Sequence, residues 1–179
     1  MSLSRSLRDP RPEPDPREVG RVRRELVGRL DPWSYWVVDL GHELPADLAV
    51  VGTTGAFGIL VDGREGYLEA DGGKLSVDRR PISGFRDAKT AAKRLRSRLG
   101  QAAVYTEVVP MICLSRAVAG ASRTIRGVRV VRLQDLAGEI AGREKSLSAN
   151  RARRGAEALG SVVATGQGAR PEVEDPEHH

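Results

Sequence analysis

The sequence predicts an α/β protein whose mixed β-sheet carries helices on both faces, in the order helix, three strands, helix, strand. Three observations support this fold class. An amphipathic helical pattern precedes a run of short apolar segments, a second such helix follows them, and a fully apolar segment comes directly after that helix. A helix that leads into a buried strand is typical of a crossover connection, so we expect a mixed sheet rather than a purely antiparallel one.

The first part of the chain is predicted to be one helix followed by a β-meander. Val19, Val22 and Leu26 recur at helical spacing, and Asp31-Pro32 ends that pattern. A Thr-Thr-Gly turn then separates two apolar segments, which predicts an antiparallel pair of strands. In order, the predicted elements are a helix over residues 17–30 and strands over residues 33–40, 46–52, 56–62, 66–69 and 74–77.

The second part contains the strongest helical pattern in the chain. Between residues 84 and 99, Ala88, Ala91, Leu95 and Leu99 form an apolar stripe, and the opposite face is basic. After it we predict a strand over residues 108–114, a loop over 120–126, a strand over 128–133, a short helix over 134–141 and a basic helix over 145–159.

The length of 179 residues fits one domain with tails. The leader is rich in prolines and charges where a signal peptide would be apolar, and no apolar run is long enough to span a bilayer. The expected location is therefore cytoplasmic, with no membrane partner. The predicted organisation is a disordered leader over residues 1–16, a folded domain over 17–142, a basic C-terminal helix over 143–160 and a disordered tail over 161–179.

Several classes of protein are disfavoured by what the sequence lacks. It contains no P-loop and no G-x-G-x-x-G motif, so we expect no nucleotide cofactor. Its single cysteine, Cys113, excludes a disulfide framework and a cysteine-based zinc site, and its apolar neighbours predict a buried thiol. His42 is predicted to be a loop residue rather than part of a catalytic triad. The aromatic share of 4% argues against a platform for stacking RNA bases.

Charge is distributed in blocks of opposite sign. Residues 31–76 hold eight acids and two bases, whereas residues 77–100 hold eight bases and two acids. In a nucleic-acid enzyme this order would place a phosphate-attracting surface beside metal-binding carboxylates. The alternative is that the basic residues only solvate helix faces in an arginine-rich chain. The candidate nucleic-acid contacts are Arg79, Arg80, Arg86, Lys89, Lys93 and Arg96.

Residues 44–60 resemble the hairpin of the nuclease-related domain family, abbreviated NERD. This family belongs to the restriction-endonuclease-like nucleases with a PD-(D/E)xK site. Asp47 matches the family's Asp at the start of an apolar strand. Gly52 and Gly55 match the turn that follows, and Gly66 matches the glycine after the second strand.

The resemblance extends over about residues 17–141 and implies a restriction-endonuclease-like core of αβββαβ order. A glutamine that the family often carries near the next helix corresponds to Asp87. The catalytic pair departs from the family's pattern, because its acid falls on Leu60 and its lysine on Asp62. Magnesium-dependent hydrolysis needs two carboxylates to hold the ion and a lysine to orient water, and a leucine does neither.

A shift of two residues along the strand would restore part of the motif. Asp62-Gly63-Arg64 then reads as acid-x-base, with Asp47 and Asp62 sharing Mg²⁺ and Arg64 supplying a fixed positive charge. The alternative is an ordinary turn at Asp62-Gly63 that ends the strand, with Asp47 accepting only backbone hydrogen bonds. Further candidates for a displaced site are Glu69, Asp71 and Lys74.

These features predict a nuclease-like domain with an eroded active site that binds DNA, a protein partner or a second copy of itself without catalysis and without a cofactor. One alternative is a weak Mg²⁺-dependent deoxyribonuclease that uses Asp47, Asp62 and Arg64. The other is a protein-interaction module unconnected with nucleic acid. Loss of metal binding in Asp47→Ala would distinguish the nuclease, and a steep salt dependence would distinguish the DNA-binding protein.

Overall fold

The computed structural model describes residues 11 and 13–163, and its first helix, α1 (Pro16–Arg29), begins close to the predicted position. Asp15 caps this helix by accepting a hydrogen bond from the N–H of Arg17 at 2.9 Å, and a proline occupies the first turn. Val22 and Leu26 turn inward and are fully buried against the sheet.

The predicted meander is present as β1 (Tyr35–Asp39), β2 (Leu48–Gly52) and β3 (Gly55–Asp71), joined in antiparallel register. The tight turn between β2 and β3 places Gly52 opposite Gly55. Every residue of β2 is buried, because helices cover both faces of the sheet at this strand.

The length of β3 corrects two expectations. The strands predicted over residues 56–62 and 66–69 are one continuous strand, so the interpretation of Asp62-Gly63 as a strand-ending turn is wrong. The physical reason is a partner on the other side: β3 runs parallel to a later strand along most of its length, and a register shift between Asp62 and Glu65 absorbs the irregular residues.

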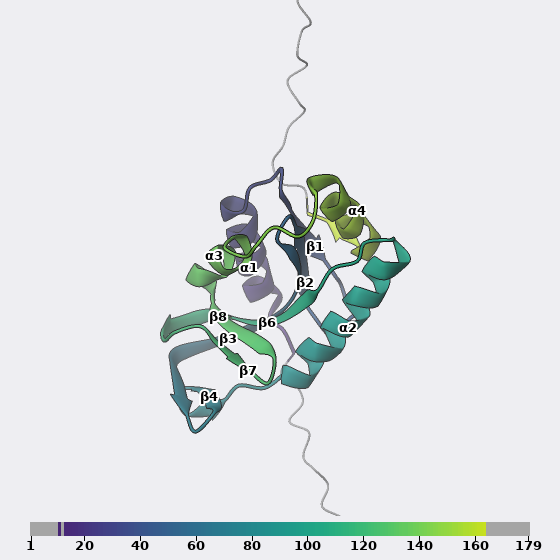
Figure 1. Cartoon of the computed structure of the whole chain (residues 1–179). Coiled ribbons are helices and arrows are strands. Elements are labelled where there is room, and N and C mark those ends of the chain that lie inside the picture. Colours follow the sequence, from purple (N-terminus) through teal and green to yellow (C-terminus); the bar gives the residue numbers. More distant parts are fainter. Residues whose placement is uncertain (1–10, 12, 164–179) are drawn as a thin grey trace, which may run out of the picture.

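Beyond the covered part of the sheet, β3 turns back into a hairpin extension. Its partner β4 (Lys74–Val77) follows a turn in which Gly72 and Gly73 have φ of 53° and 76°. A short strand, β5 (Arg80–Pro81), pairs with β4 and leads to the second helix. Figure 1 shows this extension as the blue-teal hairpin at the lower left.

The second helix, α2 (Phe85–Gln101), is the predicted crossover. It delivers the chain to β6 (Val108–Ala119), which is parallel to β3, and β8 (Val128–Arg132) is in turn parallel to β6. The predicted loop over residues 120–126 contains a short strand, β7 (Arg123–Ile125). The chain reverses directly after β7, and β8 then pairs with it in antiparallel register.

Two helices complete the fold. The first, α3 (Leu133–Ala141), follows β8, and α4 (Ala149–Leu159) begins at Ser148, whose hydroxyl accepts from the N–H of Arg151. The strand β9 (Ser161–Val162) then pairs with β1, although a disordered tail was expected from residue 161 onward. Residues 164–179 of that predicted tail lie outside the described residues.

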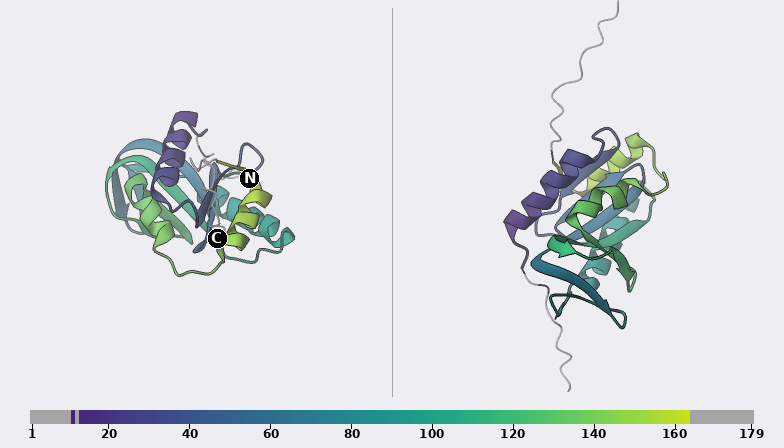
Figure 2. Two further views of the ribbon diagram at one scale, coloured as in Figure 1. Left: turned by 90° about the horizontal axis from the view of Figure 1, so that it is seen from above. Right: turned by 90° about the vertical axis from the view of Figure 1, so that its left-hand side faces the viewer.

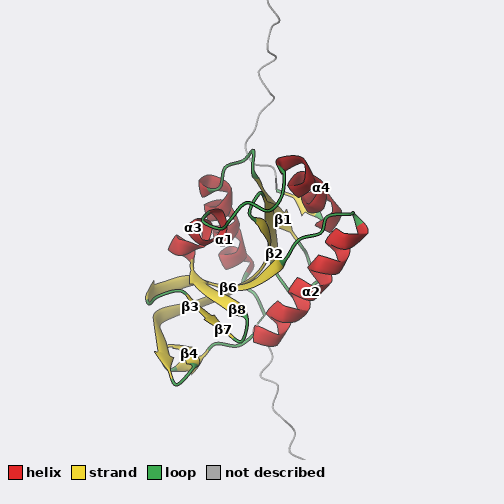
Figure 3. Ribbon diagram, viewed as in Figure 1, coloured by secondary structure: helices red, strands yellow, loops and turns green. Residues whose placement is uncertain are grey.

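The sheet has the order β7-β8-β6-β3-β2-β1-β9 and lies between two helical layers. Helices α1 and α3 cover one face, and α2 and α4 cover the other, which confirms the mixed sheet with helices on both faces (Figures 2 and 3). Cys113 is fully buried in the layer with α1, as predicted. No helix among the described residues is long and apolar enough to cross a membrane.

Candidate functional site

Asp47 lies at the start of β2 and is tied to β3 by its backbone and its side chain. Its N–H donates to the carbonyl of Ile59 at 3.0 Å. Its Oδ2 accepts the N–H of Val61 at 2.7 Å, because β2 begins only at Leu48 and leaves that N–H without a strand partner. The expected structural role of Asp47, accepting a backbone hydrogen bond, is therefore confirmed.

Arg11, in the leader, contacts the Asp47 side chain. Its guanidinium forms an ion pair with Oδ2 of Asp47, and the same nitrogen lies 3.5 Å from the carbonyl oxygen of Val61. The Arg11 side chain is 14% exposed and that of Asp47 is 7% exposed. The expectation that residues 1–16 lack structure is thus wrong for Arg11, because a buried carboxylate holds its side chain.

Burial and ion pairing act in opposite directions on Asp47. Burial raises the pKa of Asp47 above its ordinary value of 3.8, while the charge of Arg11 and the hydrogen bond from Val61 lower it. The net effect is a raised pKa, because the free energy lost when the carboxylate is removed from water exceeds the stabilisation by one cation and one amide N–H. Arg11 therefore relieves only part of the cost of burying Asp47.

Asp62 is also neutralised by an arginine. Arg64 donates from Nε to Oδ1 of Asp62 at 3.0 Å and from Nη2 to Oδ2 at 2.7 Å, while its own N–H adds a bond to Oδ1 at 3.0 Å. Its Nη1 donates to the carbonyl oxygen of Pro81 at 2.8 Å, which ties the pair to β5. The predicted acid-x-base motif thus exists as a forked ion pair.

The strand position two residues before Asp62 carries a hydrocarbon side chain, that of Leu60. Leu60 is 2% exposed and packs where α2 begins, with Cδ2 only 3.2 Å from where a Cβ on Gly84 would lie. Leu60 and Asp62 project to the same face of β3 because strand side chains alternate. The region therefore contains two paired carboxylates and one leucine.

This donor set does not fit Mg²⁺. A magnesium site needs oxygen ligands that can turn toward the ion, but Asp62 is held on both oxygens by Arg64 and Asp47 faces Arg11. Among the described residues, no group of three or more His, Cys, Asp or Glu side chains could hold a metal ion.

The remaining site candidates lie on the hairpin extension and in the first turn of α2. Asp71 and Lys74 face one another across the turn at the tip of the hairpin extension, and Glu69 is exposed on the same strand. Asp87 is in the first turn of α2, half-buried, and has no hydrogen bond or ion pair to Asp47 or Asp62. Among the described residues, none of these four forms a hydrogen bond or ion pair with Asp47 or Asp62.

The cations of α2 form an exposed face, as predicted. They point away from the buried stripe of the helix, and within residues 11 and 13–163 they form no ion pair, whereas the neighbouring Arg98 is paired with Glu43 at 2.9 Å. Sequence reasoning missed Arg94, which is exposed on the same helix. We call this set the α2 basic face: Arg86, Lys89, Lys93, Arg94 and Arg96.

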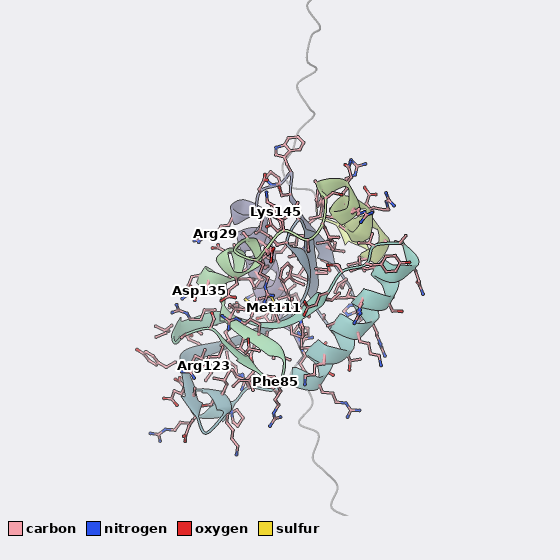
Figure 4. The ribbon with its side chains drawn as sticks, viewed as in Figure 1. Arg29, Phe85, Met111, Arg123, Asp135 and Lys145 are labelled. Carbon is pink, nitrogen blue, oxygen red and sulfur yellow. The ribbon has the colours of Figure 1, made fainter. Side chains whose placement is uncertain are left out.

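Helix α4 extends this surface, because it packs beside α2 on the same side of the sheet. Arg151 and Arg154 are exposed there, and Arg153 is paired with Glu157 at 3.2 Å. Figure 4 shows nitrogen-tipped side chains projecting from both helices into solvent. The predicted basic C-terminal helix is therefore present on the same side of the sheet as α2, although it begins at Ala149 rather than at residue 145.

Arg79 lies in the turn between β4 and β5, Arg80 begins β5, and both are exposed. Arg79 has a φ of 62°, in the left-handed region that favours glycine. Its neighbour Asp78 holds the turn by accepting the N–H of Tyr67 at 2.8 Å. The two arginines lie on the hairpin extension, so they add to the positive surface ahead of α2.

A buried polar pair on the opposite face was not anticipated. Ser115 is 4% exposed, and its Oγ donates to Oε2 of Glu18 at 2.6 Å, which joins β6 to α1. Neither residue stands out in the sequence, because their pairing depends on a sequence separation of 97 residues. His42 is an exposed loop residue, as expected.

No family model, no curated protein and no solved structure matches the chain.

Proposed function

We propose that the chain is a non-catalytic, nuclease-like domain that binds the phosphate backbone of DNA through the α2 basic face. The order α1, β1 to β3, α2, β6 supports a restriction-endonuclease-like core, since β3 and β6 are parallel across the crossover helix. The resemblance to the nuclease-related domain family over residues 44–60 supports the same assignment.

The observation that carries the proposal is the pairing state of the arginines and lysines. At the sheet, Arg11 forms an ion pair with Asp47, and Arg64 forms one with Asp62. On α2, five cations have no acidic partner among the residues that the structure describes. Unpaired cations at three- and four-residue spacing can each approach a phosphate and release its counterions, which provides affinity without sequence selection.

The same contrast argues against catalysis. Metal-dependent hydrolysis of a phosphodiester requires carboxylates that are free to hold the metal and a base or lysine beside the attacking water. Both carboxylates are paired with arginine, Leu60 replaces the second acid, and an arginine does not give up its proton near neutral pH.

Binding of a fluorescent DNA duplex over a range of salt concentrations tests the proposal. Lys89→Gln/Lys93→Gln removes two charges from the α2 basic face. It is expected to weaken binding at low salt and to reduce the slope of log K against log salt concentration by about 1–2. Both side chains are exposed, so the fold should be unaffected.

A matched control removes two charges from the opposite helical layer. Arg17 and Arg24 are exposed on α1 and form no ion pair among the described residues, so Arg17→Gln/Arg24→Gln changes net charge equally. Binding by this variant should stay close to that of the wild type. Equal losses in the two variants would contradict a role for the α2 basic face, and absence of duplex binding at low salt would favour a protein partner.

A further inference from the structure

A cavity opens where three separate segments meet at the start of α2. Its volume is about 270 Å³, and it lies between the β4–β5 hairpin, the first residue of α2 and the turn from β7 to β8. The floor is apolar, because Leu75 and Ile82 are 4% and 6% exposed and belong to the core. Phe85 and Ile125 are half-buried and form its walls.

Two cations stand at the rim of this cavity. Lys74 begins β4, and Arg126 occupies the turn between β7 and β8 with a φ of 52°. Both are exposed and form no ion pair among the described residues. A non-glycine residue in the left-handed region is unfavourable, so the turn holds Arg126 at the rim at some cost in stability.

The cavity is continuous with the surfaces already described. A Cβ on Gly127 would lie 3.8 Å from Cε of Lys89, so the turn that carries Arg126 touches the α2 basic face. On the other side, Pro81 lines the cavity and accepts a hydrogen bond from Arg64, the partner of Asp62. A strand lying along α2 would therefore pass the mouth of the cavity.

The geometry points to this cavity as a subsite for one unpaired nucleotide, with the base against Phe85 and the phosphate between Lys74 and Arg126. This inference rests on the proposed function, because it adds a terminal contact to backbone binding along α2. An aromatic ring beside a positively charged rim is the combination that binds single nucleotides irrespective of sequence. The volume lies just below the range of about 300–1,000 Å³ that is typical of pockets for drug-sized ligands, which suits a ligand the size of one base.

The lining also predicts weak selectivity. The cavity walls contain no amide or carboxylate side chain that could pair with the edge of a base. Purines and pyrimidines should therefore differ only in the strength of their stacking on Phe85. An unpaired nucleotide at a DNA end and a free mononucleotide offer the same chemistry, so both are included in the test.

Two titrations distinguish these sources. The full chain is titrated with dAMP and observed by NMR, and its affinity for a duplex with a short single-stranded overhang is compared with that for the blunt duplex. We expect the overhang to bind about tenfold more tightly. Arg126→Gly and Phe85→Leu should remove that preference and weaken dAMP binding while leaving blunt-duplex affinity nearly unchanged.

The variants are chosen to preserve the fold. Glycine is favoured at the φ of Arg126, and leucine keeps an apolar side chain at position 85 without the ring. Arg79→Gly is the matched control, because Arg79 is also an exposed arginine in the left-handed region but does not line the cavity. It should retain the overhang preference and the binding of dAMP.

Each outcome is decisive. Binding of dAMP or an overhang preference that is lost in Arg126→Gly but kept in Arg79→Gly supports the subsite, and shows which source it accepts. No dAMP binding together with equal affinity for the two duplexes overturns it, even if the blunt duplex binds through α2. Loss of duplex binding in Lys89→Gln/Lys93→Gln concerns the proposed function alone.

Discussion

Asp47 is a buried carboxylate that is held beside β3 by two partners. It lies immediately before β2, and its contacts are an arginine from the leader and the N–H of Val61. Since burial outweighs both contacts, the protonated form is favoured more than in an ordinary Asp. Its Oδ2 is engaged by Arg11 and by the N–H of Val61, so this oxygen is not free to turn toward a hard cation.

The raised pKa gives a prediction with a definite sign. A folded-state pKa above 3.8 means that the native state binds more protons than the unfolded state in the interval between the two values. The contribution of Asp47 to stability therefore falls as the pH rises through that interval. Relative to Asp47→Asn, which stays neutral and can still accept the N–H of Val61, the wild type should lose stability as the pH increases from about 4.

Urea denaturation of the wild type and Asp47→Asn across this pH range is the measurement. The difference in the free energy of unfolding should shift in favour of Asp47→Asn with increasing pH and become constant once Asp47 is ionised in both states. A shift in favour of the wild type would mean that Arg11 dominates over burial, and that the ion pair holds the pKa of Asp47 below 3.8.

At the scale of elements, replacing a glycine by alanine is expected to have opposite effects on the free energy of unfolding at two positions. A Cβ on Gly52 would lie 2.1 Å from the ring of Tyr35 and 2.9 Å from the carbonyl oxygen of Ser34, so β1 and β2 could not keep their spacing. Gly52→Ala should lower the free energy of unfolding by about 1–3 kcal/mol or more.

Gly138 is the matched position. It is exposed in α3, and a Cβ there would meet no other atom within 4 Å. Gly138→Ala should raise the free energy of unfolding by about 0.5–1 kcal/mol, because alanine is the better helix former. Thermal and urea denaturation measure both variants, and a loss of stability in Gly138→Ala would contradict the exposed position of that face of α3.

The elements that could be predicted are those whose signal is local. The helical stripe of Ala88, Leu95 and Leu99 and the glycine turn between β2 and β3 reflect short-range periodicity and turn chemistry. The continuation of β3 past Asp62 could not be predicted in this way. It depends on pairing with β6, more than 40 residues later, which overrides the turn-forming preference of Asp62-Gly63.

In the candidate site, too, the features that follow from local spacing could be predicted, and those that depend on distant contacts could not. The proximity of Asp62 and Arg64 follows from their spacing on a strand, and the exposure of the α2 cations follows from helical periodicity. The contact of Arg11 with Asp47 joins residues 36 apart in sequence, and nothing in the leader marks Arg11 above its neighbours. The cavity at the start of α2 was equally hidden, because three separate segments form it.

At the scale of the whole molecule, the fold separates two uses of positive charge. Arginines at the sheet neutralise its buried carboxylates, and cations on the α2 and α4 layer remain in solvent. A net charge of +5 favours polyanions in general, and we propose that they bind at the layer with α2 and α4. We therefore propose both that the domain binds DNA and that it leaves the DNA intact.

One gel-shift experiment on supercoiled plasmid DNA at low salt tests both halves of that claim. Wild type and Asp47→Ala are compared in the presence of Mg²⁺ or Mn²⁺, and the DNA is recovered afterwards by digesting the protein. We expect the wild type to retard the plasmid and the recovered DNA to be still supercoiled. Nicked or linear DNA with the wild type but not with Asp47→Ala would contradict the loss of catalysis, and an unretarded plasmid would contradict DNA binding.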